Sequence, residues 1–258
     1  MTEKTGNIHI GTSGWHYNHW RGLFYPADLK PSKMLSYYIR YFDTVEINNS
    51  FYRLPTVATL EDWRDNTPED FCFAVKGSRW LTHMKKLKEP EAGLGNLIPR
   101  VEILGKKLGP ILFQLPPFWN CNLERLEAFL VALPGKHHYS FEMRNSTWHN
   151  RDVYDLLRSH NVAFCIYELE GFLTPFEVTA DFTYIRLHGP QGAYQGSYDS
   201  ASLADWASRA KEWQSRLKDV YIYFDNDQAA YAAYNALELK KLVGKKEPQR
   251  HKEQKDSL

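Results

Sequence analysis

Eight short apolar runs recur along the chain, each rich in β-branched and aromatic residues and each about as long as one β-strand. These strands are predicted at 8–13, 44–49, 71–76, 111–115, 139–144, 162–167, 183–188 and 221–225. Segments with helical spacing separate most of them, and the clearest apolar helix face consists of Leu203, Trp206, Ala210, Trp213 and Leu217. The stretch around 171–179, between the sixth and seventh strands, is too short and broken for a full helix.

This alternation of strands and helices predicts parallel strands joined by helical crossovers. An open doubly wound sheet usually carries a G-x-G-x-x-G fingerprint after its first strand, whereas this chain has Gly11-Thr12-Ser13-Gly14-Trp15 there. We therefore predict an α/β fold, a single (β/α)₈ TIM barrel over residues 8–243 with an irregular or missing sixth helix. Residues 1–7 are expected to be a flexible N-terminus, and 244–258 a disordered charged tail.

The composition of the chain limits the kinds of molecule that it is expected to bind and the compartment in which it is expected to lie. The 258 residues suit one barrel, and 32 Lys and Arg against 31 Asp and Glu give a net charge of +1, which argues against non-specific binding of duplex nucleic acid. The three cysteines, Cys72, Cys121 and Cys165, lie far apart and are expected to be buried thiols in a reducing compartment. No secretory signal and no long apolar run is evident, so we expect a cytoplasmic protein without a membrane partner.

Polar side chains collect at the carboxyl ends of the predicted strands. They are Glu46, Asn48, Lys76, Gln114, Glu142, Arg144, Arg186, His188 and Asp225. Barrel enzymes assemble their sites from several strand ends, and buried polar groups are costly unless they pair or take part in chemistry. A purely structural network, in which Glu46, Lys76, Glu142 and Arg144 neutralise one another, is the alternative interpretation.

The loops after these strands are rich in rings, which favours a pocket that stacks a sugar, a base or another flat group. The rings and imidazole that we expect to contact a substrate are Trp15, His83, Trp148, Tyr194 and Tyr198. The loop at 189–198 contains three glycines, whose backbone N–H groups can approach an anion. A mobile lid is the other interpretation of this loop.

The chain also resembles the YecE-like family, domain of unknown function seventy-two, from about Ile8 to about Leu242. The resemblance implies a TIM barrel and no particular reaction. One departure is Asp225-Asn226-Asp227, where an Asn-Asn-Asp run is expected. The motifs that carry the resemblance are Gly11-Thr12-Ser13-Gly14-Trp15 with Trp20-Arg21-Gly22; Thr44-Val45-Glu46-Ile47-Asn48 with Phe51-Tyr52-Arg53; Phe73-Ala74-Val75-Lys76 with Thr82-His83; Gln114-Leu115-Pro116-Pro117; Glu142-Met143-Arg144; and Arg186-Leu187-His188-Gly189.

The favoured hypothesis is an enzyme, a hydrolase, lyase or isomerase, that acts by general acid/base chemistry on a small anionic or ring-containing substrate such as a phosphorylated sugar or a nucleotide-like molecule. Its predicted catalytic residues are Glu46, Lys76, Glu142, His188 and Asp225. Its predicted substrate-binding residues are Trp15, Asn48, His83, Gln114, Arg144, Trp148, Arg186, Tyr194 and Tyr198. Within this class, a glycosidase needs two carboxylates flanking one bond, and strands two and five are expected to hold Glu46 and Glu142 too far apart.

Two other classes remain as alternatives. A metal-dependent hydrolase or isomerase would use Glu46, Glu142, His188 and Asp225 as ligands, but neighbouring cationic side chains would repel a divalent metal, so no cofactor is expected. A non-catalytic module that binds nucleic acid or nucleotides would use the basic and aromatic residues at the carboxyl-end opening of the barrel, which we call the mouth. The basic stretch at 85–88 is more typical of a solvated face, so nucleic acid is not the favoured partner.

Overall fold

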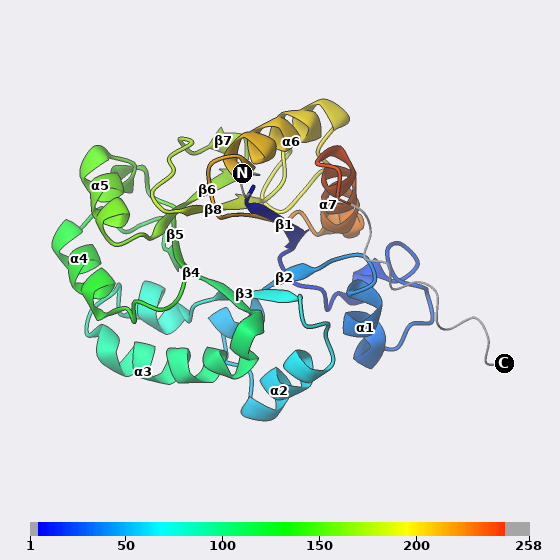
Figure 1. Cartoon of the computed structure of the whole chain (residues 1–258), viewed down its shortest axis with the longest axis horizontal. Helices are drawn as coiled ribbons and strands as arrows, with labels where there is room; N and C mark the ends of the chain where they lie inside the picture. Colours follow the sequence, from blue (N-terminus) through cyan, green and yellow to red (C-terminus); the bar gives the residue numbers. More distant parts are fainter. Residues whose placement is uncertain (1–4, 246–258) are drawn as a thin grey trace.

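Eight parallel strands form a barrel with helices around its outside, as predicted (Figure 1). The computed structural model describes residues 5–245. The barrel strands are β1 (Asn7–Thr12), β2 (Thr44–Ile47), β3 (Cys72–Lys76), β4 (Leu108–Leu115), β5 (Tyr139–Met143), β6 (Ala163–Leu169), β8 (Phe182–Leu187) and β9 (Asp219–Phe224). Each coincides with one of the eight predicted runs, so the fold class is confirmed.

The strands are hydrogen-bonded in the order β1-β9-β8-β6-β5-β4-β3-β2. The seam between β1 and β2 closes at a single parallel bridge between Ser13 and Glu46, where the Gly14 N–H donates to the Glu46 carbonyl at 2.8 Å. Gly11 lies two residues before Ser13. A Cβ atom built on Gly11 would come within 2.4 Å of the Thr44 carbonyl oxygen. The absence of a side chain at Gly11 therefore lets β1 and β2 approach closely enough to close the barrel.

Within residues 5–245, seven α-helices cover the outside of the barrel (Figure 1). Four of them begin at a side-chain cap that the local sequence supplies, namely Thr56, Asn122, Asn150 and Asp199, each accepting a hydrogen bond from a first-turn N–H. The helices are α1 (Met34–Tyr38), α2 (Val57–Asp65), α3 (Pro90–Val101), α4 (Leu123–Ala132), α5 (Arg151–Ser159), α6 (Ser200–Gln214) and α7 (Tyr231–Leu242).

The sixth connection has no helix, which confirms the prediction for this segment. Strand β6 turns through Glu170 and Gly171, both with positive φ, and pairs antiparallel with the two-residue strand β7 (Phe172–Leu173). Two consecutive residues with positive φ are the signature of a tight hairpin turn. The chain then continues without a helix to β8, so this side of the barrel is covered by a hairpin and a loop.

The barrel interior is filled by inward-facing side chains, because alternate residues of a strand point to the same side. Its apolar part is a small cluster that includes Cys165, Tyr184, Tyr221 and Tyr223. Two tyrosine hydroxyls of this layer are hydrogen-bonded across the barrel: Tyr223 shares a hydrogen bond of 2.7 Å with Thr44, and Tyr184 donates to Glu46 at 2.6 Å. This layer forms the floor on which the polar groups at the carboxyl ends of the strands rest.

The ordered chain reaches beyond the predicted limits at both ends. In the segment expected to be flexible, Gly6 donates to Gln214 and Asn7 is already part of β1. At the other end, Lys245 forms an ion pair of 2.9 Å with Asp43. The remainder of these two predicted segments, 1–4 and 246–258, lies outside the described residues.

Gly11→Ala is expected to lower the free energy of unfolding by about 1–3 kcal/mol, because its methyl group would push the backbone of β2 away from β1. Urea unfolding of the purified protein measures this change. Gly95→Ala is the matched control, since Gly95 is an exposed position inside α3 with open space around it. The control should be stabilised by about 0.5–1 kcal/mol, and a Gly11→Ala midpoint equal to wild type would contradict the closure argument.

Candidate functional site

A buried arginine on β8 organises the carboxyl end of the barrel. Arg186 has no exposed surface and donates to three carboxylates from three other strands. Its Nη2 lies 2.7 Å from Glu46 and 2.9 Å from Asp225, and its Nη1 lies 2.6 Å from Glu142. All four residues are among the site residues predicted from the sequence. The structure brings Arg186, Glu46, Glu142 and Asp225 together in one group, the ion network.

Glu46 has both oxygens occupied. Its Oε1 accepts from Ser13 and Arg186, and its Oε2 accepts from Arg186 at 3.0 Å and from the Tyr184 hydroxyl at 2.6 Å. The side chain is fully buried. Four donors therefore hold this carboxylate in place, and none of its surface is exposed.

Glu142 is similarly engaged. Its Oε2 accepts from Arg186, and its Oε1 accepts from the Nε of Arg144 on the same strand face. Burial alone would raise the pKa of Glu142, but the guanidinium groups of Arg144 and Arg186 hold it well below its usual value. Glu142 is therefore ionised at neutral pH and is occupied by these two arginines.

His188 is also buried and paired on both ring nitrogens. Its Nδ1 lies 3.0 Å from Asp225 Oδ2, and its Nε2 lies 3.1 Å from a terminal nitrogen of Arg144. The same Nε2 also lies 3.5 Å from Glu142 Oε1, so the ring is held between Asp225 on one side and Glu142 with Arg144 on the other. The imidazole thus links Asp225 to Arg144, and no ring nitrogen is left free as a proton carrier.

Lys76 differs from the other predicted catalytic residues because no carboxylate lies within ion-pair distance of its amine among the described residues. Its Nζ lies 4.5 Å from the centroid of the Phe51 ring, and the side chain is 8% exposed. Burial, with a contribution from the positive charge of Arg186, lowers the pKa of Lys76 to about 8. This is the combination of a buried amine and a near-neutral pKa that characterises reactive lysines.

His83 shares the Phe51 ring with Lys76. The ring edge of His83 meets Phe51 at a centroid distance of 5.0 Å, and its Nδ1 is hydrogen-bonded to the Thr82 hydroxyl at 2.9 Å. Burial, then the charge of Lys76 and more weakly that of Arg144, lowers the pKa of His83, so it is neutral at pH 7. Lys76 and His83 therefore contact the same aromatic ring.

Other predicted substrate-binding residues border the mouth. Arg144 is 9% exposed in its side chain and stacks over Tyr167 at 5.2 Å. Tyr194, which is 41% exposed, meets His188 edge-on at a centroid distance of 5.4 Å. Asn48 and Gln114 are half-buried at the ends of β2 and β4, and neither side chain has a hydrogen bond within the described part of the chain.

Two predicted contact residues pack into the loops instead. Trp148 is fully buried, meets Trp119 at 5.0 Å and donates its indole N–H to the Trp119 carbonyl. Tyr198 is 3% exposed, and its hydroxyl accepts from the Gly189 N–H at 3.1 Å, which fixes the glycine-containing loop. Both rings are therefore buried by packing within the loops, and the sequence pattern did not indicate this packing.

A groove of about 670 Å³ opens beside the mouth, between the loops that follow β1 and β2. Its aromatic wall includes Trp15 and Trp63, whose rings meet at 5.0 Å in an edge-to-face arrangement. Tyr17 lines the groove, and burial together with the charges of Asp225 and nearby carboxylates raises its pKa. Tyr17 therefore stands between the groove and the ion network, so the two are adjacent.

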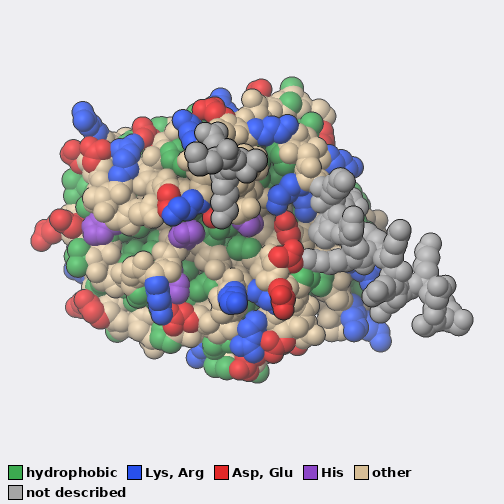
Figure 2. Space-filling view, in the orientation of Figure 1, with side chains coloured by type: hydrophobic (Ala, Val, Ile, Leu, Met, Phe, Trp, Pro, Cys, Tyr) green, Lys and Arg blue, Asp and Glu red, His purple; other side chains and the backbone are tan. Residues whose placement is uncertain are grey.

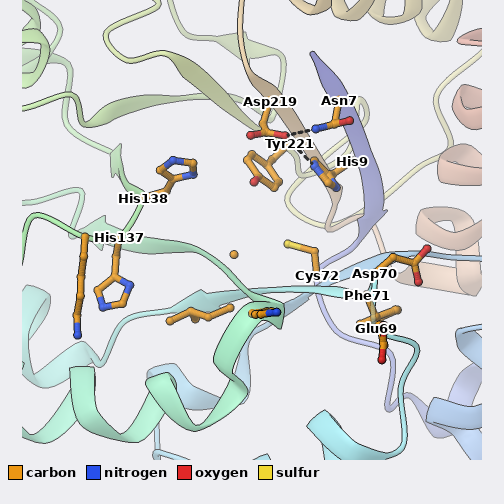
Figure 3. A pocket seen from close by; sticks show the side chains of 14 residues that line it. Asn7, His9, Glu69, Asp70, Phe71, Cys72, His137, His138, Asp219 and Tyr221 are labelled. Atoms are coloured by element: carbon orange, nitrogen blue, oxygen red, sulfur yellow. Dashed lines mark hydrogen bonds and ion pairs between the residues drawn. The ribbon is translucent and has the colours of Figure 1, made fainter. Parts of the chain in front are cut away.

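The opposite end of the barrel holds a second cavity of about 360 Å³, which Figure 3 shows. His9 and Asn7 both contact Asp219 there, at 3.1 and 3.0 Å, and His138 stacks on Phe182. Burial raises the pKa of Cys72, on the wall of this cavity, to about 12, so its thiol stays protonated. All three cysteines are free thiols; Cys165 is buried, and Cys72 and Cys121 are half-buried rather than fully buried as expected.

Glu46 and Glu142 do not flank an open space, as the two carboxylates of a glycosidase would. Although their strands lie apart in the barrel, a single guanidinium group, that of Arg186, bridges the two carboxylates. That guanidinium occupies the space in which a glycosidic bond would have to sit, so this pair does not have the arrangement of a glycosidase. Among residues 5–245, no three His, Cys, Asp or Glu side chains are grouped so that they could hold a metal ion.

Sequence reasoning missed three residues that complete the site, Ser13, Phe51 and Tyr184. Tyr184 is the inward-facing position two residues before Arg186, so the alternation of β8 could have revealed it. Ser13 directly follows β1, two residues after Gly11, and its hydroxyl donates to Glu46. Phe51 belongs to the loop after β2, and no pattern in the sequence distinguishes it from the other loop aromatics.

Together the fold and the site define a class: a single TIM barrel whose carboxyl-end mouth carries a buried ion network beneath an unpaired lysine. The chain belongs to the family described as "Protein of unknown function DUF72", which matches residues 9–257. The family resemblance seen in the motifs is thereby confirmed. Among the described residues, no helix has the length and apolar character needed to cross a membrane.

Relatives and solved structures agree with this assignment. UPF0759 protein YunF of Bacillus subtilis is 28% identical over 92% of this chain and 94% of its own length. UPF0759 protein YecE of Escherichia coli K12 is 30% identical over 54% of this chain and 48% of its own length. A DUF72 family protein from Thermotoga maritima superposes with a TM-score of 0.84 at 29% identity, covering 92% of this chain and 99% of that one.

Arg186→Met is expected to lower the free energy of unfolding at pH 7 by about 3–5 kcal/mol, because it leaves three buried carboxylates without their shared cation. Arg186 depresses the folded-state pKa values of Glu142 and Asp225. Their contribution is therefore fully present above about pH 4 and is lost as the pH falls through those depressed values. The loss of stability in Arg186→Met should accordingly be largest near pH 7 and narrow in acid.

Urea unfolding at pH 7 and pH 3.5 measures both parts of this prediction. Arg158→Met is the control, since Arg158 forms surface ion pairs with Asp155 and Glu177. The control should change stability by less than about 1 kcal/mol at either pH. A loss for Arg186→Met that is equally small would show that the network is not a stabilising unit.

Proposed function

We propose that this protein is an enzyme that binds a small substrate, bearing both an anionic group and a ring, at the carboxyl end of the barrel. The observation that carries the proposal is the division of charges at the mouth. The carboxylates face inward onto Arg186, whereas the side chains left without a hydrogen bond or ion pair among the described residues are an amine and two neutral amides, those of Lys76, Asn48 and Gln114. A ligand that enters the mouth would therefore meet cationic and neutral groups first.

Arg144 and Lys76 are the candidates for contact with the anionic group. The Nη1 of Arg144 has no hydrogen-bond partner in the described part of the chain, since its other nitrogens contact Glu142 and His188. The His188 and Glu142 contacts also fix the guanidinium plane, which suits recognition of a carboxylate or phosphate. Lys76 supplies a second cation, held in place by the Phe51 ring.

The adjacent groove is the candidate site for the ring. Trp15, Tyr17 and Trp63 provide an aromatic wall, and Asn48 at the end of β2 provides a free side-chain amide. An apolar cleft with a few polar groups is the usual form of a small-molecule site. A substrate that spans the groove and the mouth would place its ring against tryptophan and its anionic group near Arg144.

Lys76 is the proposed proton-transferring group of this enzyme. Of the five residues predicted to be catalytic, it alone has no side-chain hydrogen bond or ion pair among the described residues, and its pKa of about 8 permits proton transfer near neutrality. Glu46, Glu142, His188 and Asp225 then act as positioning residues that hold Arg144 and the floor of the mouth. General acid/base chemistry is thus assigned to an amine rather than to a carboxylate.

Lys76→Met and Arg144→Met should each weaken binding of inorganic phosphate and of ribose 5-phosphate by at least about tenfold, since a charge-assisted hydrogen bond contributes about 1.5–3 kcal/mol. Isothermal titration calorimetry at low ionic strength measures the dissociation constants. Lys88→Met, an exposed lysine beyond the same loop, is the control and should bind as wild type. Equal affinity in all four proteins would show that the mouth is not an anion site.

Trp63→Ala should weaken binding of ribose 5-phosphate while leaving inorganic phosphate binding unchanged, because the ring-binding wall lies in the groove and the anion site lies in the mouth. A loss of about 1–3 kcal/mol is the magnitude expected when a ring loses its stacking partner. The same titrations measure it. Parallel losses for both ligands, or none for either, would argue against a separate ring subsite.

A further inference from the structure

We propose that the amine of Lys76 is a nucleophile that forms an imine with its substrate, so that the substrate class is an aldehyde or ketone carrying an anionic group. This inference rests on the proposed function and names its chemistry more closely. It comes from the surroundings of Lys76, which differ from those of every other charged side chain in the mouth.

The first part of the argument is the lack of a counter-ion. The carboxylates of Glu46, Glu142 and Asp225 are bound by Arg186 at 2.6–2.9 Å. None is within ion-pair distance of Lys76 in the described chain, so its ammonium form gains no salt bridge. Its nearest charged or titratable neighbours are these three carboxylates, Arg186 and, across the Phe51 ring, His83.

The second part is the availability of the neutral amine. A lysine with an ordinary pKa near 10.4 is about 0.04% neutral at pH 7, whereas one with a pKa of about 8 is about 10% neutral. Because only the neutral amine has a free electron pair, the nucleophilic fraction of Lys76 is more than about 100-fold larger. The Phe51 ring lies against the amine, with its centroid 4.5 Å from Nζ, and offers no hydrogen-bond acceptor that would occupy the electron pair.

The third part is a neighbour able to move protons. His83 is half-buried and neutral, its Nδ1 is bonded to Thr82, and its Nε2 is free among the described residues. Attack of the Lys76 amine on the carbonyl carbon forms a C–N bond, and the carbonyl oxygen takes up the proton that nitrogen loses. The hydroxyl of this carbinolamine then takes up one further proton from solvent, relayed through His83. Its C–O bond breaks to release water, and the nitrogen electron pair forms the C=N bond of a protonated imine that keeps its N–H.

Arg144 determines the rest of the substrate. The Arg144 guanidinium, held by Glu142 and His188 at the same end of the barrel as Lys76, would bind a carboxylate or phosphate elsewhere on the same molecule. The imine carbon draws electrons from the adjacent carbon, which makes proton removal or carbon–carbon cleavage there easier. Among the enzyme classes considered, this chemistry belongs to a lyase or an isomerase, and it needs no oxidant or reductant.

Imine trapping tests the inference directly. The protein is incubated with pyridoxal 5′-phosphate, used only as an anionic aldehyde on a ring, and reduced with borohydride, which delivers hydride to the imine carbon and fixes it as a secondary amine. Peptide mass spectrometry then gives the rate of labelling at each lysine. Lys76 should be labelled at least about tenfold faster than exposed lysines such as Lys88 and Lys211, with a rate that rises as the pH increases through about 8.

Further comparisons separate the contributions of the phosphate group, Arg144 and His83 to the labelling of Lys76. Pyridoxal, which lacks the phosphate, and the Arg144→Met variant should each reduce labelling at Lys76 by about tenfold while leaving Lys88 unchanged. His83→Asn should slow labelling at Lys76 without weakening phosphate binding. Lys76→Met removes the site, and if that variant does not fold, the pH profile of labelling in the wild-type protein still tests the inference.

Labelling of Lys76 no faster than that of exposed lysines would overturn the imine inference. If phosphate binding still depends on Lys76 and Arg144 in that case, the proposed anion-binding function stands by itself. If phosphate binding is also independent of both residues, the two proposals fail together. Fast labelling that is insensitive to the phosphate and to Arg144→Met would overturn the anionic part of the substrate class.

Discussion

The buried guanidinium of Arg186 is the charge on which the carboxyl end of this barrel depends. It has no exposed surface and is shared by carboxylates from β2, β5 and β9. Three buried anions without a cation would be prohibitively costly, and one cation without anions would be costly as well. The four residues therefore fold into place together, and each strand end is fixed relative to the others.

The same interaction joins barrel closure to the site. Glu46 is a partner of Arg186, and its backbone also forms the bridge to Ser13 at the seam between β1 and β2. Closing the seam places the carboxylate, and the carboxylate in turn holds the Ser13 hydroxyl. A substitution that opens the seam, such as one at Gly11, would consequently disturb the network from below.

The network also decides which groups can meet a ligand. Because the carboxylates are turned toward Arg186 and Arg144, they support the mouth and do not line its free surface. Among the described residues, the amine of Lys76 and the remaining guanidinium nitrogen of Arg144 have no hydrogen-bond or ion-pair partner. The chemistry of the mouth is consequently that of an amine beside an anion-binding group, which is the basis of both proposals.

The chain's own pattern was sufficient for the architecture and for the membership of the polar cluster. Period-two alternation, turn residues and caps such as Asn122 and Asp199 act within a few residues, so they can be read along the sequence. The polar residue at each strand end is likewise a local feature. Local signals do not specify partners, and so Trp148 and Tyr198 were predicted at the mouth although both pack into loops.

The sequence by itself determined the eight strands, the missing sixth helix and the collection of charges at one end of the barrel. Only the tertiary structure decided which of those charged side chains form ion pairs with one another and which do not. It paired Glu46, Glu142 and Asp225 with one arginine, and it left Lys76 against the ring of Phe51. The physical reason is that ion pairing, burial and pKa depend on distances between strands far apart in the chain, which no pattern along one strand contains.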